Sequence, residues 1–243
     1  MITFRPLTDA DLAAFAPSFL KTKIEGLSRA YGACPGLLET WAQEREGAVT
    51  ALICRFGGKV SLTAKTGDTA ELAEFLRFLG APAECEEALA KRLGFPITDR
   101  ASVYQKEIVR GEEAPLFLRT EHFEVTAKRL MLADSPDIEI ADEAGFIADL
   151  SHRVRHGAAL AAETEHGTAV IGFLAEEAAI LSGVTTEKAY RGRGEAKRLL
   201  AALESHLNRK TLFAATRAAD GFYAACGYRK TGALCRLTPI GKE

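Results

Sequence analysis

The junction between a strand and a helix at residues 178–207 limits the possible folds of this chain more than any other segment. Apolar residues from Ala178 to Thr186 predict a strand, and residues 195–207 carry leucines at helical spacing. The short basic loop between them contains Gly192 and Gly194. The first amides of a helix lack internal partners and its dipole is positive at that end. Glycine lets such a loop turn several amides toward a ligand. The junction therefore predicts an anion site suited to a phosphate or pyrophosphate.

This loop does not match the two best-known phosphate-binding motifs. The GxxxxGK[ST] loop is absent, and the dinucleotide fingerprint would need a third glycine and an acidic residue about 20 positions later. A simple strand-to-helix turn with a solvated Arg193 is the alternative interpretation of so short a glycine pattern.

The chain divides into two halves at a polar segment. Residues 101–108 predict a strand, and the Gly- and Pro-containing stretch 109–115 follows it. We expect domains at 1–110 and 118–243, joined by a linker at 111–117. A second break is expected at residues 134–137.

The predicted elements indicate an α/β (α+β) fold with a mixed sheet and helices packed on it. The first half is expected to hold helices at 9–19, 68–79 and 84–93 and strands at 50–56, 59–64 and 101–108. The second half is expected to hold helices at 122–133, 142–155, 195–207 and 219–225, and strands at 158–163, 168–174, 178–186, 211–216 and 232–237.

One pattern occurs in both halves. Residues 87–95 and 221–228 each predict a helix that ends in Gly followed by an aromatic residue, and a strand follows each. Each half also carries a hairpin before these helices. This suggests two diverged copies of one unit, although shared helix-stop chemistry would give the same pattern.

Two motifs in register resemble the GNAT superfamily of acyl-CoA-dependent N-acetyltransferases. Arg191-x-x-Gly194-x-Ala196 is similar to the family signature [Q/R]-x-x-G-x-[G/A], which follows the fourth strand and opens a helix. Thr216-x-x-Ala219-x-x-x-Tyr223-x-x-x-Gly227-Tyr228 resembles the downstream N-x-x-A-x-x-x-Y-x-x-x-G-[FY], with Thr216 in place of the usual Asn. The resemblance covers roughly residues 140–240.

The resemblance implies a fold and a cofactor. It implies two GNAT-like domains, each a mixed, mostly antiparallel twisted sheet flanked by helices, with a degenerate first copy in which Ala90 stands in the register of Tyr223. It implies acetyl-CoA as co-substrate. The implied cofactor-binding residues are Val184, Thr185, Thr186, Arg191, Gly192, Arg193, Gly194, Glu195, Ala196 and Thr216.

The resemblance also implies a reaction, in which a primary amine attacks the thioester directly. Tyr223 would act as the general acid that protonates the departing thiolate, and a phenol is a usable donor for this step. The alternative for Tyr223 is a packing role beside Phe222. We hypothesise that the first half binds no cofactor and covers one wall of the acceptor cleft.

The general base stays open. Strand 178–186 holds no carboxylate where many family members have a Glu, and the candidates are Glu163, Glu165 and Glu187. His152 and His156 belong to a cationic cluster that either contacts the acceptor or simply complements a helix end. A metal site is not expected, because no third ligand accompanies these histidines.

Composition excludes other classes of partner. The net charge of -2 lacks the basic excess of a nucleic-acid binder. No apolar run approaches the ~18 residues of a membrane span, and no signal peptide is seen, so we expect a cytoplasmic protein. The five cysteines are odd in number and scattered, and we expect free thiols rather than disulfides.

The expected function is N-acetyl transfer to a small-molecule or peptide amine, without a nucleic-acid or membrane partner. The acceptor and the oligomeric state are not evident from the sequence. The alternatives are a non-catalytic acyl-CoA sensor and a transferase that uses another acyl donor.

Overall fold

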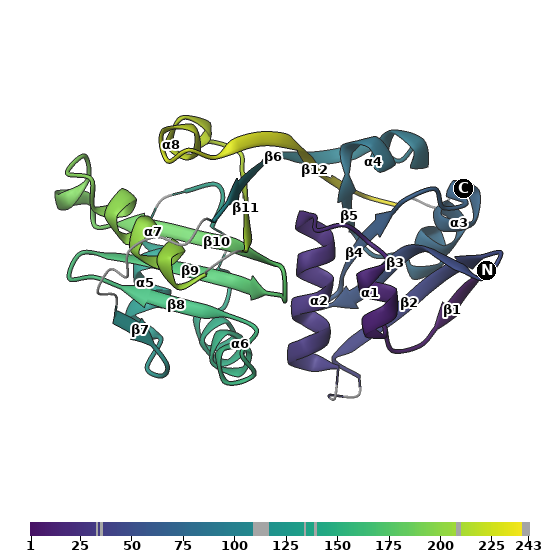
Figure 1. Cartoon of the computed structure of the whole chain (residues 1–243), viewed down its shortest axis with the longest axis horizontal. Coiled ribbons are helices and arrows are strands. Elements are labelled where there is room, and N and C mark those ends of the chain that lie inside the picture. Colours follow the sequence, from purple (N-terminus) through teal and green to yellow (C-terminus); the bar gives the residue numbers. More distant parts are fainter. Residues whose placement is uncertain are drawn as a thin grey trace. The chain divides into compact units, whose positions relative to one another are not determined.

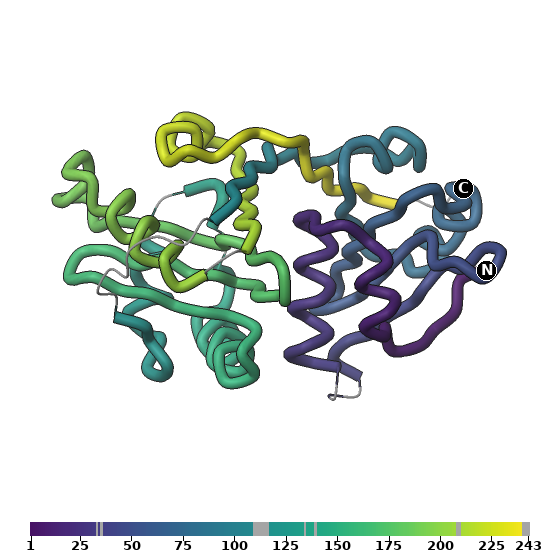
Figure 2. The backbone as a smooth tube through the Cα atoms, in the orientation of Figure 1, coloured from purple at the N-terminus to yellow at the C-terminus, as the bar shows by residue number. Residues whose placement is uncertain are grey.

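The computed structural model describes residues 1–32, 34, 36–108, 117–133, 135–138, 140–207 and 210–239 (Figures 1 and 2). The chain forms two compact units. Unit 1 consists of Met1–Val103 and Gly232–Glu243, and unit 2 of Tyr104–Thr231. The expected linker at 111–117 lies outside the described residues except for Phe117, and so does Asp134 at the expected second break.

Unit 1 is a mostly antiparallel sheet with helices packed on it. Its hydrogen-bonded strands follow the order β1-β2-β3-β4-β5-β12, in which only the β4–β5 pair is parallel. The elements are β1 (Ile2–Phe4), α1 (Asp9–Ala13), α2 (Phe19–Tyr31), β2 (Leu38–Arg45), β3 (Ala48–Phe56), β4 (Lys59–Ala64), α3 (Thr69–Leu79), β5 (Ala83–Glu86), α4 (Glu87–Leu93) and the first part of β6 (Ile97–Glu107), with the last part of β12 (Arg229–Leu237).

Unit 2 repeats this plan. Its strands follow the order β6-β11-β10-β9-β8-β7, and here only β10–β11 is recorded as a parallel pair. The elements after the end of β6 are β7 (Phe117–Arg119), α5 (Glu124–Met131), α6 (Glu143–Arg155), β8 (Leu160–Glu163), β9 (Gly167–Leu174), β10 (Ala178–Thr186), α7 (Glu195–His206), β11 (Thr211–Thr216), α8 (Asp220–Ala225) and the start of β12.

Alternation along β9 places helices on both faces of the unit 2 sheet. Val170 packs with Leu130 of α5 and Leu150 of α6. Its neighbour Ile171 packs with α7 leucines such as Leu203. Successive strand residues point to opposite faces, so α7 covers one face and the α5–α6 pair covers the other (Figure 1).

The shared element order agrees with a duplicated unit. In both units three antiparallel strands lead into a helix, a parallel strand and a short helix: β2-β3-β4-α3-β5-α4 in unit 1 and β8-β9-β10-α7-β11-α8 in unit 2. Both units also have the expected fold class, a mixed and mostly antiparallel sheet flanked by helices.

The units differ from the expected halves at two strand ends. Residues 104–108 belong to unit 2, where the amide of Ile108 donates to the carbonyl of Lys210 at 3.0 Å. Residues 232–237 belong to unit 1, because Leu234–Leu237 pair antiparallel with Ala83–Glu86. Each unit is thus completed by a strand that lies on the other side of the sequence boundary.

The local signals explain most elements. Thr8 caps α1 in a capping box with Asp11, and Gly80 ends α3 in the left-handed region at φ 59°. Helix α2 was not expected, and the helix expected at 84–93 begins only at Glu87. The preceding Ala83–Glu86 is strand β5, because pairing with β4 and β12 outweighs its local helix preference.

The helices and the cysteines bear on two expectations, the absence of a membrane span and the presence of free thiols. No helix in the described part of the chain is long and apolar enough to cross a membrane. All five cysteines are free thiols, as expected.

Candidate functional site

Strands β10 and β11 separate part-way along their length. Their parallel pairing runs from Ala178↔Thr211 to Leu181↔Ala214 and stops there. On its other edge β10 pairs with β9 to its end, with an irregularity at Ser182 between the pairs Leu181↔Ile171 and Gly183↔Val170. Such a bulge bends a strand away from its neighbour. Residues 182–186 therefore keep one backbone edge without a strand partner.

Alternation along β10 identifies the backbone groups on this open edge. The amide of Glu187 donates to the carbonyl of His166 at 2.9 Å, so it points toward β9. Backbone groups alternate in direction, and Val184 and Thr186 therefore point away from β9. The carbonyl of Thr186 accepts a hydrogen bond from Arg191 Nε at 3.1 Å. The Val184 amide therefore points to the open edge, where it has no strand partner.

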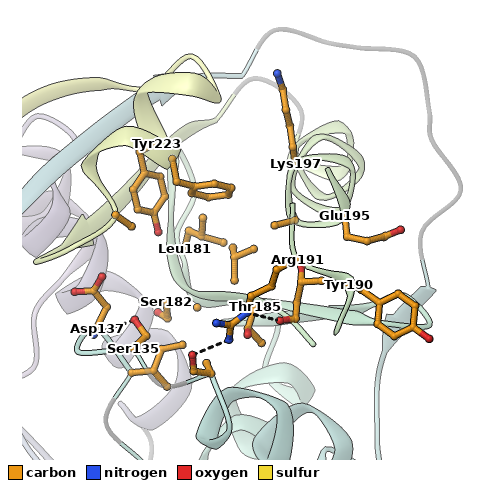
Figure 3. A pocket seen from close by; sticks show the side chains of 18 of the residues that line it. Ser135, Asp137, Leu181, Ser182, Thr185, Tyr190, Arg191, Glu195, Lys197 and Tyr223 are labelled. Carbon is orange, nitrogen blue, oxygen red and sulfur yellow. Dashed lines mark hydrogen bonds between the residues drawn. The ribbon is translucent and has the colours of Figure 1, made fainter. Parts of the chain in front are cut away.

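A cavity of about 430 Å³ lies along this edge (Figure 3). Its walls come from β10, the following loop with the start of α7, the start of α8 and the turn before α6. They include Ser135, Asp137, Ile138, Leu181, Ser182, Gly183, Val184, Thr185, Thr186, Tyr190, Arg191, Gly192, Gly194, Glu195, Ala196, Lys197, Phe222 and Tyr223. The volume is within the usual range for small-molecule sites.

At one end of the cavity the loop enters α7 through two left-handed glycines. Gly192 has φ 77° and Gly194 has φ 79°. The first hydrogen bond of the helix is donated by Arg198 N to Gly194 O at 3.0 Å. The amides of residues 195–197 precede it, and Gly194 offers no capping side chain. These amides are free to bind an anion.

Tyr223 stands at the other end of the cavity. Its side chain is buried and packs against Tyr104, with ring centroids 5.6 Å apart. Figure 3 shows the hydroxyl directed into the cavity. Burial raises the pKa of this phenol, and the negative charge of Asp137 raises it further. Tyr223 therefore keeps its proton well above neutral pH.

The comparisons with known proteins agree with this geometry. Residues 140–237 match the family model described as an acetyltransferase (GNAT) domain. This stretch, less than half of the chain, is therefore similar to a GNAT domain. A comparison with curated proteins finds no match.

Solved structures extend the similarity to the whole chain. A tandem GNAT protein from the clavulanic acid biosynthesis pathway covers all of both chains at 13% identity and TM-score 0.56. A GNAT-family acetyltransferase from Colwellia psychrerythraea covers 98% of both chains at 14% identity and TM-score 0.54. A GCN5-related N-acetyltransferase from Kribbella flavida covers 92% of this chain and 95% of its own, at 15% identity and TM-score 0.57. At such identities these similarities establish the fold, which is that of a tandem GNAT protein.

The structure gathers most of the expected cofactor-binding residues of unit 2 on one cavity. Arg193 and Thr216 are not in its lining. The guanidinium of Arg193 lies 5.2 Å from the ring centroid of Tyr190, which stacks on His166. Arg191 reaches the lining but supports the loop, since its guanidinium also donates to Ala133 O at 2.9 Å.

Sequence reasoning missed Asp137. The turn before α6 brings this residue to the cavity wall (Figure 3), and the hydroxyl of Thr216 donates a hydrogen bond to its carboxylate. Thr216 is only 1% exposed, donates to Asp137 Oδ2 at 2.5 Å and accepts from Ala219 N at 2.8 Å. No motif marks Asp137, because its position depends on a contact 79 residues along the chain.

The three glutamates suggested as bases lie elsewhere in unit 2. Glu163 is buried and accepts from Arg119 at 2.6 Å and Thr126 at 2.5 Å. Glu165 has an 87% exposed side chain, and Glu187 pairs with Arg129 at 2.9 Å. None of the three is in the cavity lining.

The histidines also lie away from this cavity. His152 and His156 stack on each other on α6, with centroids 4.3 Å apart, and neither lines the cavity. Within the described residues no group of three His, Cys, Asp or Glu side chains could hold a metal.

Proposed function

We propose that this protein transfers an acetyl group from acetyl-CoA to a primary amine. One observation carries the proposal. A single cavity extends from the free amides at the start of α7, along the unpaired edge of β10, to the buried phenol of Tyr223. An anion site, an extended backbone edge and a proton donor are the three features that a pyrophosphate, a pantetheine arm and a thiolate leaving group require.

The residues of the loop fit the pyrophosphate of CoA. A Cβ at Gly192 would meet no atom within 4 Å, so the space beside this loop is open. The amides of residues 192–197 would donate to the phosphate oxygens, helped by the positive end of the α7 dipole. Arg191 would keep the loop in place through its bonds to Thr186 O and Ala133 O. Val184 to Thr186 would offer the open edge of β10 to the amide groups of the pantetheine arm.

The opposite end of the cavity suits the chemical step. The amine nitrogen would attack the thioester carbon, and the Val184 amide would donate to the carbonyl oxygen as negative charge develops on it. Tyr223 would protonate the departing sulfur. Its raised pKa keeps the phenol protonated at neutral pH, so the donor is present at every turnover.

Unit 1 would bind no CoA, because the corresponding helix start is already occupied. Helix α3 follows β4 as α7 follows β10, but Asp68 caps it. Asp68 Oδ1 accepts from Ala70 N at 3.0 Å and from Glu71 N at 3.2 Å. This carboxylate would repel a phosphate. Ala90, in the register of Tyr223, is buried in the core of unit 1 and offers no proton.

The test measures CoA binding and turnover separately. Calorimetry reports CoA affinity, and thiol release from acetyl-CoA with a panel of primary amines reports turnover, with the acetylated product identified by mass spectrometry. We expect both activities in the full chain. CoA binding without turnover on any amine would favour the sensor alternative, and turnover with a different thioester only would favour another donor. Failure to bind CoA would refute the proposal.

A further inference from the structure

The Tyr223 end of the cavity contains a carboxylate that the proposed reaction has not yet used. Asp137 has a side chain only 16% exposed and lines the cavity. Its Oδ1 accepts from Arg217 N at 2.6 Å and its Oδ2 from Thr216 Oγ1 at 2.5 Å. These two bonds fix the carboxylate, yet each of its oxygens can accept a further bond.

Asp137 supplies the negative charge at this end. The other carboxylate among the described lining residues is Glu195, the first residue of α7, which forms an ion pair with Arg198 and lies away from Tyr223 (Figure 3). Asp137 forms an ion pair with Arg217, whose Nη1 is 3.8 Å from Oδ1. That distance is too long for a hydrogen bond, so Nη1 does not take up an accepting position of the carboxylate.

The rest of this end offers hydroxyls and apolar surface. Ser135, Ser182 and Tyr223 lie around Asp137 in Figure 3, and Ile138, Leu181 and Phe222 add apolar walls. An ammonium group is a strong partner for a fixed, partly buried carboxylate, because an ionised pair gives a charge-assisted hydrogen bond. An amine that is neutral at pH 7 would gain much less from the same contact.

We propose that Asp137 receives the ammonium group of the acceptor and takes its proton, so that the acceptors are aliphatic amines that are cationic at neutral pH. This inference rests on the proposed function. It gives unit 2 a base in the turn before α6, because β10 itself has no carboxylate. Thr216 is then a positioning residue, which acts on the acceptor through Asp137.

The protons and electrons of this step balance. The ammonium gives one proton to Asp137, and the freed nitrogen lone pair forms the bond to the thioester carbon. The carbon–sulfur bond breaks, its electron pair goes to sulfur, and sulfur takes the proton of Tyr223. The second nitrogen proton returns to the Tyr223 oxygen, directly or through water, and Asp137 releases its proton to solvent. One amide, one thiol and one proton are formed.

A binding experiment tests Asp137 without any need for turnover. The full chain is saturated with CoA and titrated with benzylammonium or with benzyl alcohol, which has a similar shape and no charge, and NMR shifts give the two affinities. We expect the wild type to favour the cation by at least about tenfold. Asp137→Asn should lose this preference while it binds CoA as the wild type does.

A matched control replaces a carboxylate outside the cavity. Glu177→Gln changes an exposed turn between β9 and β10, and it should keep the preference for the cation. If the wild type shows no preference for benzylammonium, or Asp137→Asn keeps one, the assignment of Asp137 is overturned. This result does not depend on whether acetyl transfer occurs.

A turnover experiment separates charge recognition from a structural role. Benzylamine is cationic at pH 7, and aniline is neutral there. Asp137→Asn should lower kcat/KM for benzylamine by about 10²-fold or more, as for loss of a general base, and lower it for aniline by less than about threefold. Equal losses for both amines would refute the proposed role. If the wild type acetylates neither these amines nor any other in the panel, acetyl transfer fails, and the binding experiment still decides whether Asp137 receives the ammonium group.

Discussion

Replacing Gly194 by valine tests whether the loop before α7 binds CoA through its backbone. Gly194 has φ 79°, and the atom nearest to an added Cβ is Arg198 Nη1 at 4.0 Å. The new side chain would therefore meet no steric block within the protein. Its cost comes from the left-handed backbone, about 1–2 kcal/mol for a residue with a Cβ and more for a β-branched one.

The loop can respond to this cost in two ways, and both weaken CoA binding. If residue 194 stays left-handed, a side chain lies where the pyrophosphate approaches. If it relaxes, the amides at the start of α7 turn away from the phosphate. Loss of one hydrogen bond to a charged group is worth about 1.5–3 kcal/mol. The Kd for CoA should then rise roughly 10- to 150-fold.

The assay is calorimetric titration with CoA, combined with urea unfolding. Gly58→Val is a matched control, because Gly58 has φ 73° and no atom within 4 Å of an added Cβ, but lies in the β3–β4 hairpin of unit 1. It should lose comparable stability and keep the wild-type CoA affinity. A folded Gly194→Val protein with wild-type CoA affinity would show that the loop does not bind the pyrophosphate.

Three further predictions concern the general acid, the stoichiometry and acid stability. Tyr223→Phe should lower kcat by about 10²–10⁴-fold with little change in CoA affinity; a wild-type rate with chemistry limiting would leave Tyr223 only its packing role. Calorimetry should give one CoA per chain, since Asp68 caps α3, and a value near two would contradict this. Arg5 holds the pKa of Asp11 below its ordinary value, so Asp11 stabilises the fold above about pH 4 and loses this effect as the pH falls. Asp11→Asn should lower the free energy of unfolding in urea by about 1–2 kcal/mol at pH 7 and by less below pH 4. The exposed Asp9→Asn should lower it little at either pH. Equal losses for Asp11→Asn at both pH values would count against the pairing of Asp11 with Arg5.

The sequence by itself determined the elements whose signals are local. Strand 178–186 and strand 211–216 have the expected bounds, and α7 and α8 lie within one residue of their expected starts. The glycines of the loop before α7 are left-handed, a conformation that glycine adopts readily. Such signals depend on periodicity, caps and glycine conformation, which neighbouring residues decide.

Pairing between distant strands decided the elements that the sequence could not determine. The segment Ala83–Glu86 leads directly into α4 and contains the good helix formers Ala and Glu, yet it pairs with β4 on one side and with Leu234–Leu237 on the other. The partner strand lies about 150 residues away. The segment forms its strand hydrogen bonds only with this distant partner in place. The residues in and around the segment therefore do not determine whether it becomes a strand or extends the helix.

The candidate site shows the same division. The loop before α7 could be found from its glycines and its place between a strand and a helix, and Tyr223 from the resemblance of its motif to the GNAT superfamily, because residues close in the chain form each motif. Asp137 could not be found, since its carboxylate is placed by Thr216 Oγ1 and by the amide of Arg217 at the end of β11. The open edge of β10 was equally hidden, because it exists only where β10 and β11 separate after Leu181 and Ala214. Only tertiary structure brings a turn, a strand end and a helix start around one cavity.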